Sequence, residues 1–435
     1  MDKQSGYRFK NLNVRRSELQ VTTTIDPIRL EKRIEELSEI GRIGCTGVSR
    51  LAHSRKDKEA VLQVKKWMGE AGLQTRIDHF GNLIGRMDGK DPGMPILMLG
   101  SHIDSQPYGG RFDGVIGVLG ALEVVQTMND HNIVPSVPIE VVAFADEEGC
   151  RFNKGLFGVR GIIGRLEDGE LEREDKDGVS RREALIEFGC NPDRFGESEY
   201  VHSTIGSFLE LHIEQGPVLE IAEKPIGIVT GISGPLWLTV KLRGLAGHAG
   251  SVPMNKRQDA LLGAAKIIVT LNELVSEIPG APTVGTVGSL KVFPDSGNII
   301  PEEVTFTVDL RDINEERRNQ IEQKLRVEIT RIAEENGLTC EITEDTRNEP
   351  RFCSEKIMNV MRKESREMEL DLPELMSGPF HDSLAMSYVC DYGMIFVRSK
   401  DGISHNPKEF STLEDIALGT ELLYRTVTNM VNTDQ

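Results

Sequence analysis

The sequence places histidine and carboxylate residues at spacings that suit metal binding and the activation of water. His102 and Asp104 are two residues apart at the expected end of a strand, where alternate side chains share a face. Asp104 can therefore accept a hydrogen bond from the imidazole of His102, a contact that fixes the tautomer of a metal-bound histidine. A satisfied polar strand end is the alternative interpretation of this pair.

Carboxylates follow at two further places. Asp113 lies in the glycine-flanked string 109–114, at the expected start of a helix, where glycines permit close backbone approach; an ordinary helix N-cap is the alternative. Glu147 and Glu148 come directly after Asp146 and an expected strand, so like charges are crowded there unless cations neutralise them. One glutamate can bind metal while the other acts as general base, and a plain acidic loop is the alternative.

Two more histidines complete the set. His212 lies on the alternating strand 209–216, and His405 lies in the turn-rich segment 402–407. A single histidine is more often structural than a ligand. Together, however, three histidines and two or three carboxylates at successive strand ends supply donors suited to zinc, manganese or cobalt. The joint pattern predicts a metal centre.

The elements expected around these residues form an open α/β sheet. Apolar runs at 95–100 and 138–145 predict buried strands, and a helix is expected between them at 115–128. In such sheets ligands bind at the carboxyl ends of the strands, where the polar residues gather. Further helices are expected at 25–43, 56–71, 355–366 and 413–432, and a further strand at 393–397.

A second pattern occupies the middle of the chain. Strands are expected at 236–242, 283–292, 303–311 and 338–342, with helices at 257–278 and 314–336. This β-α-β-β-α-β order is typical of a ferredoxin-like α+β domain. We therefore expect a polar tail at 1–24, a discontinuous α/β catalytic domain at 25–224 and 347–435, and an inserted domain at 225–346.

Composition narrows the classes of partner. The 435 residues carry a formal charge of -18, which repels nucleic acid and acidic membrane surfaces, so an anionic substrate needs a local positive site. No run of about 18 apolar residues occurs, and residues 1–24 lack the hydrophobic centre of a signal peptide. We expect a cytoplasmic enzyme that binds neither nucleic acid nor membranes. Six cysteines without a C-x-x-C pair are expected to be reduced thiols.

Several of these strings resemble one enzyme superfamily. GSHIDSQP at 100–107, GGRFDG at 109–114, DEE at 146–148, GHAG at 247–250 and the segment 402–407 resemble the di-metal aminoacylase and carboxypeptidase superfamily. HIEQGP at 212–217 is similar to its amidase branch, which hydrolyses N-carbamoyl-L-amino acids, allantoate and related ureido acids. Peptidase branches typically carry a carboxylate where this chain has His212. The resemblance implies a di-metal catalytic domain and an inserted lid through which two copies form a homodimer.

The resemblance also implies roles for individual residues. Two divalent metal ions (zinc, manganese, cobalt or nickel) would be bound by the sets His102, Asp113, His212 and Asp113, Glu148, His405, with Asp113 bridging. Catalytic roles fall to Glu147 as general base, Asp104, and His248 as the residue that stabilises the oxyanion. The substrate-binding residues would be Gln215 for the ureido group, Asn298 and Arg311 for a carboxylate, with His248 and His381.

Two observations leave alternatives open. Arg311 is a surface salt-bridge residue unless it faces a cleft. The string SGPFHD at 377–382 carries proline and phenylalanine where family members have two small residues, which should reshape the wall of the substrate pocket.

The function expected from the sequence is hydrolysis of a carbamoyl or ureido C–N bond on a small carboxylate substrate, releasing ammonia and carbon dioxide. An aminoacylase or dipeptidase using the same site is the alternative within enzymes. A binding protein without catalysis is disfavoured, because Glu147 and all five expected ligands are present.

Overall fold

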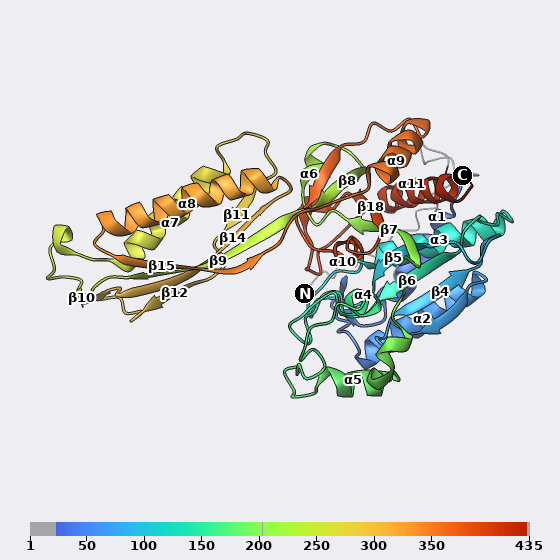
Figure 1. The fold of residues 1–435 in the computed structure, drawn as a ribbon, viewed down its shortest axis with the longest axis horizontal. Coiled ribbons are helices and arrows are strands. Elements are labelled where there is room, and N and C mark those ends of the chain that lie inside the picture. The colour runs from blue at the N-terminus through green and yellow to red at the C-terminus, as the bar shows by residue number, and fades with distance from the viewer. Residues whose placement is uncertain (1–22, 202, 433–435) are drawn as a thin grey trace, which may run out of the picture. The chain divides into compact units, whose positions relative to one another are not determined.

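The computed structural model describes residues 23–201 and 203–432, which divide into two compact units (Figure 1). Unit 1 comprises the described residues up to Ile228, Ser354–Glu374 and those from His381 onward, and unit 2 comprises Val229–Cys353 and Leu375–Phe380. The expected boundaries at 224/225 and 346/347 lie within seven residues of these. The expected tail, apart from its last two residues, lies outside the described residues.

One segment differs from the expected division. Leu375–Phe380 was expected in the catalytic domain but belongs with unit 2, since its backbone is bonded there. The amide of Ser233 donates to the carbonyl of Ser377 at 2.8 Å, and Arg311 donates to the carbonyl of Gly378, also at 2.8 Å. The chain therefore enters unit 2 twice.

Unit 1 is built on a mixed sheet with the strand order β8-β18-β7-β5-β6-β4-β3. The strands β18, β7, β5 and β6 are parallel to one another, so their carboxyl ends meet at one edge. The expected strands at 95–100 and 138–145 are β5 and β6, which are buried along their whole length. The bounds of the strands in this sheet order are β3 Gln74–Ile77, β4 Leu83–Met87, β5 Ile96–His102, β6 Ile139–Phe144, β7 Ile205–Ile213, β8 Ile226–Ile232 and β18 Asp391–Val397.

Helices pack on this sheet. The long ones are α1 Pro27–Ser38, α2 Arg55–Glu70, α3 Val115–Asp130, α9 Glu355–Glu367 and α11 Leu413–Asn432; the short ones are α4 Phe157–Ile162, α5 Arg181–Phe188, α6 Val218–Ile221 and α10 Asp382–Met386. The helix expected at 25–43 is shorter, because it is capped by Asp26 and gives way to the hairpin of β1 (Arg42–Ile43) and β2 (Gly47–Val48). The buried carboxylate of Glu123 on α3 pairs with Arg29 of α1 at 2.6 Å.

Unit 2 has the expected β-α-β-β-α-β order. Its elements are β9 Gly234–Arg243, α7 Ala260–Val275, β11 Val284–Thr286, β12 Leu290–Phe293, β14 Glu303–Asp312, α8 Glu315–Glu335 and β15 Thr339–Arg347. The sheet order is β11-β14-β9-β15, and the single strand expected at 283–292 is divided into β11 and β12, both paired with β14. The small pair of β10 (Gly247–His248) and β13 (Ile299–Ile300) also belongs to unit 2. The short strands β16 (Arg351–Phe352) and β17 (Glu374–Ser377) instead pair with β8 and extend the larger sheet to nine strands.

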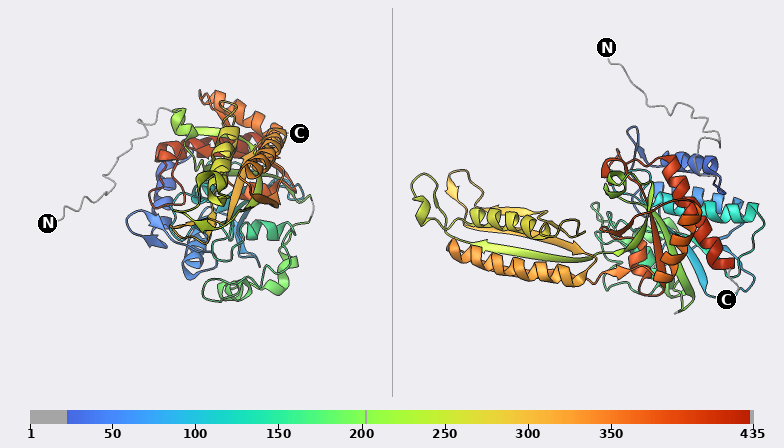
Figure 2. Two further views of the ribbon diagram at one scale, coloured as in Figure 1. Left: turned by 90° about the vertical axis from the view of Figure 1, so that its left-hand side faces the viewer. Right: turned by 90° about the horizontal axis from the view of Figure 1, so that it is seen from above.

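One face of the unit 2 sheet carries its core. Val304, Phe306, Val308 and Leu310 alternate along β14 with less buried residues and pack with apolar side chains of α7 and α8. Figure 2 shows these two helices lying side by side along the strands. The alternation turns Asp309 and Arg311 to the opposite face, away from this core.

No helix in the described part of the chain is both long and apolar enough to cross a membrane. All six cysteines are free thiols.

Candidate metal centre and active site

The carboxyl edge of the unit 1 sheet brings together the residues expected to bind metal. They form two groups whose ligand atoms lie within 4.8 Å of one another: His102, Asp113 and His212, and Asp113, Glu148 and His405. Asp113 is common to both. Each histidine comes from a different strand or loop, since His102 ends β5, His212 lies near the end of β7 and His405 follows β18.

Asp113 occupies the centre of the cluster. Its Oδ1 is 3.1 Å from Nε2 of His212 and 3.6 Å from Nε2 of His102, and its Oδ2 is 3.3 Å from Nε2 of His405. Burial raises the pKa of Asp113, but its contacts with these three imidazoles lower it well below its usual value. The two carboxylate oxygens thus face two different sets of ligands.

Two histidines have their tautomers set by backbone carbonyls. Nδ1 of His102 is 3.1 Å from the carbonyl of Asp104, and Nδ1 of His212 is 2.9 Å from the carbonyl of Ile213. With Nδ1 donating, Nε2 carries the lone pair and faces the cluster, and Nε2 of His212 accepts a hydrogen bond from the amide of Gly114. Both imidazoles are therefore oriented for coordination through Nε2.

The role expected for the Asp104 carboxylate is corrected by this geometry. Its Oδ1 lies 3.7 Å from Nδ1 of His102, beyond hydrogen-bond distance, and the backbone carbonyl of the same residue makes the contact instead. The carboxylate accepts hydrogen bonds from the amides of Glu147 and Glu148 at 3.2 and 3.3 Å. Asp104 thereby fixes the turn that carries both glutamates.

Two glycines of the string 109–114 are required by contacts around Asp113. A Cβ on Gly110 would lie 2.1 Å from Oε1 of Glu409. A Cβ on Gly114, whose φ is +64°, would lie 2.5 Å from the imidazole of His102. Gly114 is the N-cap residue of α3 and makes no side-chain cap, so the alternative of Asp113 as an ordinary N-cap is wrong.

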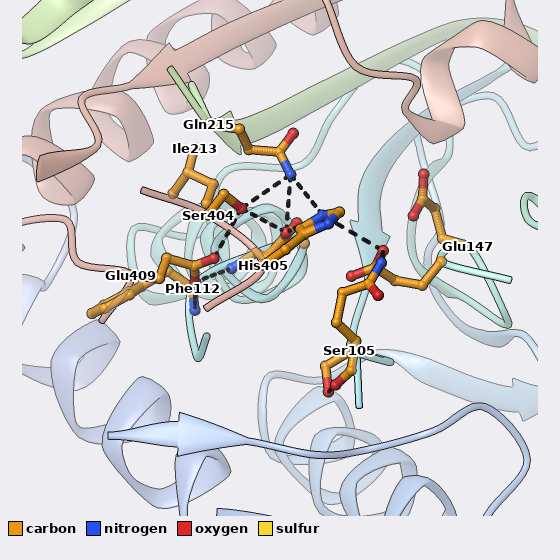
Figure 3. A network of polar contacts seen from close by, with 12 residues as sticks. Ser105, Phe112, Glu147, Ile213, Gln215, Ser404, His405 and Glu409 are labelled. Carbon is orange, nitrogen blue, oxygen red and sulfur yellow. Dashed lines mark hydrogen bonds and ion pairs between the residues drawn. The ribbon is translucent and has the colours of Figure 1, made fainter. Parts of the chain in front are cut away.

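Glu409 and Ser404 support Asp113 and were not anticipated from the sequence. Oε1 of Glu409 accepts the amides of Phe112 and Asp113 at 2.9 and 3.1 Å. The hydroxyl of Ser404 lies 3.1 Å from Oδ2 of Asp113 and 3.0 Å from Oε2 of Glu409 (Figure 3). The only sequence signal was an acidic residue four positions after His405, in a loop where acidic residues are ordinarily solvated.

Glu147 and Glu148 contact opposite sides of the cluster. They follow β6 in a bend rather than extending the strand. Oε2 of Glu147 is 3.6 Å from Nε2 of His102, whereas Oε2 of Glu148 is 3.7 Å from Nε2 of His405. Asp146 turns away and pairs with the buried Arg181 at 2.9 Å, so the acidic triplet is split.

The carboxylates of the cluster face imidazoles rather than lysine or arginine side chains. Within residues 23–201 and 203–432, no lysine or arginine pairs with Asp113, Glu147 or Glu148. Burial and the charge of Asp113 raise the pKa of Glu148 to about 7, and burial raises the pKa of Glu147 well above its usual range. Imidazole nitrogens and carboxylate oxygens gathered in this way fit divalent metal ions.

Gln215 and His381 also lie at the cluster. Nε2 of Gln215 donates to Oδ2 of Asp113 at 2.9 Å (Figure 3), and its buried Oε1 has no hydrogen-bond partner in the described structure. The ring of His381 packs on that of His212, with centroids 4.3 Å apart. Glu210, His212 and His381 form a third buried group whose possible ligand atoms lie close together. The carboxylate of Glu210 accepts hydrogen bonds from the hydroxyls of Ser101 and Ser383.

Arg311 lies in unit 2, where its guanidinium is already bonded. Nε and Nη2 bind the carboxylate of Asp309, Nη2 at 2.8 Å, so the salt bridge considered as an alternative is present. Nη1 donates to the carbonyl of Gly378, and the guanidinium carbon is 5.5 Å from the ring centroid of Phe380. Of five N–H groups, one on each terminal nitrogen is left without a bond to the described residues.

His248 and Asn298 lie at the other end of unit 2. His248 pairs with Ile299, which precedes β14, whereas Arg311 is eight residues beyond the first residue of that strand. At about 3.3 Å per residue, this separates Arg311 from Glu303 by roughly 26 Å. Within one chain, unit 2 therefore does not bring Asn298 or His248 to the guanidinium, as a shared carboxylate grip would require.

Comparison with known proteins places the chain in a family. Residues 98–429 match the family described as Peptidase family M20/M25/M40. The chain belongs to the M20/M25/M40 family. It is similar to the N-carbamoyl-L-amino-acid amidohydrolase of Pseudomonas sp. (strain NS671), with 48% identity over 93% of this chain and 99% of the relative.

Two further relatives and one solved structure are similar to the chain over most of its length. The N-carbamoyl-L-amino acid amidohydrolase of Geobacillus stearothermophilus is 43% identical over 92% of this chain and 97% of its own, and an allantoate deiminase of Arabidopsis thaliana is 33% identical over 90% and 81%. The crystal structure of a hydantoinase/carbamoylase family amidase from Burkholderia multivorans matches with a TM-score of 0.86, 35% identity and coverage of 94% and 98%. The chain is thus a mixed α/β amidohydrolase.

Replacing Gly114 with alanine should disturb the cluster through His102. The Cβ would overlap the imidazole, so we expect Gly114→Ala to lose most of its bound metal, measured by elemental analysis after loading and desalting. Gly178→Ala is the matched control, since its φ is +78° but nothing lies within 4 Å of its Cβ. Both variants should lose about 1 to 2 kcal/mol of folding free energy from backbone strain. Full metal content in Gly114→Ala would contradict the geometry.

Proposed function

We propose that the protein is a di-metal N-carbamoyl-L-amino acid amidohydrolase, which hydrolyses the carbamoyl C–N bond and releases an L-amino acid, ammonia and carbon dioxide. The observation that carries this proposal is His212, an imidazole at the position where peptidase branches typically carry a carboxylate, held within 3.1 Å of Asp113. The names of the relatives at 48% and 43% identity support the same substrate class.

Five residues would hold the metal ions in this proposal. His102 and His212 with Asp113 form one site, and Glu148 and His405 with the other oxygen of Asp113 form the second. Two divalent ions, whether zinc, manganese, cobalt or nickel, would polarise the ureido carbonyl and lower the pKa of a water at the cluster. We assign the surrounding catalytic domain to unit 1 and the lid and dimerisation domain to unit 2.

The remaining residues of unit 1 act on the proton and the ureido group. Glu147 lies 3.6 Å from Nε2 of His102 but belongs to neither group of metal ligands. Its carboxylate is therefore available to accept a proton from the attacking water and to pass it to the leaving nitrogen. The unpaired Oε1 of Gln215 can accept a hydrogen bond from the ureido N–H groups. We place His381, packed on His212, at the wall of the same site.

Metal-loaded protein should release ammonia from N-carbamoyl-L-amino acids, and the activity should disappear after chelation and return when metal is added back. Ammonia is measured by a coupled assay, with N-acyl amino acids and dipeptides as the substrates of the rival aminoacylase and dipeptidase. Faster turnover of allantoate than of every N-carbamoyl amino acid would move the assignment to allantoate, the substrate class named for the Arabidopsis thaliana relative. Full turnover in verified metal-free protein would refute the di-metal proposal.

Glu147→Gln should lower kcat by about 100-fold or more and keep the bound metal, because the amide preserves shape but accepts no proton. Metal content is measured on the same preparation as kcat. Glu148→Gln is the matched comparison and should lose metal instead. The opposite pattern would show that the roles of the two neighbouring glutamates are exchanged.

Arg311 is proposed to bind the substrate carboxylate through the N–H groups that Asp309 and Gly378 leave unused. Arg311→Lys keeps the charge but loses the fork, so kcat/KM should fall by about ten- to a hundredfold, equivalent to roughly 1.5 to 3 kcal/mol. A substrate amidated at its carboxylate should be poor with the parent protein and lose little more in the variant. An equal loss for both substrates would make Arg311 a structural salt-bridge residue.

His248 and Asn298 are proposed to serve the site of a second copy, because within one chain they are far from Arg311 along β14. His248 would stabilise the oxyanion there, and Asn298 would contact the carboxylate. A homodimer is therefore expected at assay concentrations, measured by light scattering. Mixing inactive Glu147→Gln with inactive His248→Ala should restore part of the activity in mixed dimers, and a lasting monomer with full activity would contradict this arrangement.

A further inference from the structure

Three side chains close a hydrogen-bonded ring behind Glu148. Nε2 of Gln106 donates to Oε2 of Glu148 at 2.6 Å, and the thiol of Cys150 donates to Oε1 of Gln106 at 2.8 Å. The backbone from Glu148 to Cys150 completes the ring through Gly149, whose φ is +64°. Nothing in the proposed mechanism uses Gln106 or Cys150.

The turn that closes the ring cannot easily relax. A Cβ on Gly149 would lie 2.2 Å from the amide nitrogen of Gly155, so this position is packed tightly against the next loop. The amides of Glu147 and Glu148 are both bonded to the carboxylate of Asp104. The backbone that carries Cys150 is therefore fixed, and this holds its thiol in position to contact Gln106.

The two contacts determine which way the amide of Gln106 faces. A glutamate that binds metal is an ionised carboxylate, which only accepts hydrogen bonds, so Glu148 takes the NH₂ end of the amide. The oxygen end then faces Cys150, whose S–H group is a donor. An amide turned by 180° would set its oxygen against the carboxylate of Glu148 and lose that hydrogen bond. Its NH₂ group would then face the sulfur of Cys150, which is only a weak acceptor, and the S–H group would be left with the carbonyl of Glu148 at 3.7 Å.

We propose that Gln106 is a positioning residue for Glu148 and that the Cys150 thiol holds Gln106 in its working orientation. This rests on the proposed function only in that Glu148 is taken as a metal ligand. Oε2 of Glu148 is also 3.7 Å from Nε2 of His405, so the glutamine holds the carboxylate on the side where it meets the second metal set. Without Gln106, a glutamate side chain can rotate among several rotamers and must lose that freedom when it binds metal.

The test measures zinc release without any substrate. Protein loaded with two equivalents of Zn²⁺ is mixed with excess chelating indicator, and the release of each ion is followed by absorbance. Partners behind a metal ligand typically contribute 10- to 100-fold in affinity. Cys150→Ala should therefore release one of the two zinc ions about ten times faster than the wild type, and Cys150→Ser, which keeps a donor, should release it near the wild-type rate.

Two further variants sharpen the test. Cys390→Ala is the matched control, because that thiol also donates to an oxygen, the carbonyl of Met386 at 3.6 Å, but takes no part in the ring. Its zinc release should equal that of the wild type. Gln106→Glu removes the donor and sets a second carboxylate against Glu148, so one zinc ion should bind about 100-fold more weakly.

The outcomes separate this proposal from the proposed function. Unchanged zinc release in Cys150→Ala, or equal acceleration of both ions, would overturn the positioning role. Wild-type affinity in Gln106→Glu would overturn it as well. A protein that binds two zinc ions, shows the predicted release pattern and hydrolyses no N-carbamoyl amino acid would support the ring and contradict only the substrate assignment. A wild type that binds no zinc would contradict both.

Discussion

The gathering of negative charge at one edge of a parallel sheet is the constraint on which the rest of the site depends. Asp113 is buried, Glu147 and Glu148 are partly buried, and the described residues offer them imidazoles rather than lysine or arginine partners. Such a cluster is costly unless cations enter it. The surrounding structure is arranged for that purpose: two backbone carbonyls turn Nε2 of His102 and His212 inward, and Glu409 and Ser404 hold the loop and carboxylate of Asp113.

Much of the fold and of the cluster could be predicted, because both follow from strong local patterns. Buried parallel strands are continuous apolar runs, which located β5 and β6, and the ends of such strands meet at one edge. Residues placed directly after them, such as His102 and Glu148, had to lie near one another. The β-α-β-β-α-β order of unit 2 was equally visible from its periodicity, apart from the interruption between β11 and β12.

What could not be predicted depends on contacts between distant loops. Glu409 resembles any acidic loop residue until its contact with the amides of Phe112 and Asp113 is known. The carboxylate of Asp104 was assigned to His102 from strand geometry, but the chain leaves the strand there and the backbone carbonyl takes its place. Asn298 and Arg311 were grouped by the family resemblance, and only the register of β14 shows the length of strand between them.

The path of the chain between the two units restricts how the protein can be recombined with its relatives. The chain passes from one unit to the other at 228/229, 353/354, 374/375 and 380/381, and the first of these passages falls inside strand β8. A chimaera that exchanges residues 229–353 alone would keep the parent's 375–380, whose carbonyls at Ser377 and Gly378 are bonded to the exchanged segment. Exchange of this unit between relatives therefore means exchanging two segments, 229–353 and 375–380, so that both sides of these contacts come from one parent.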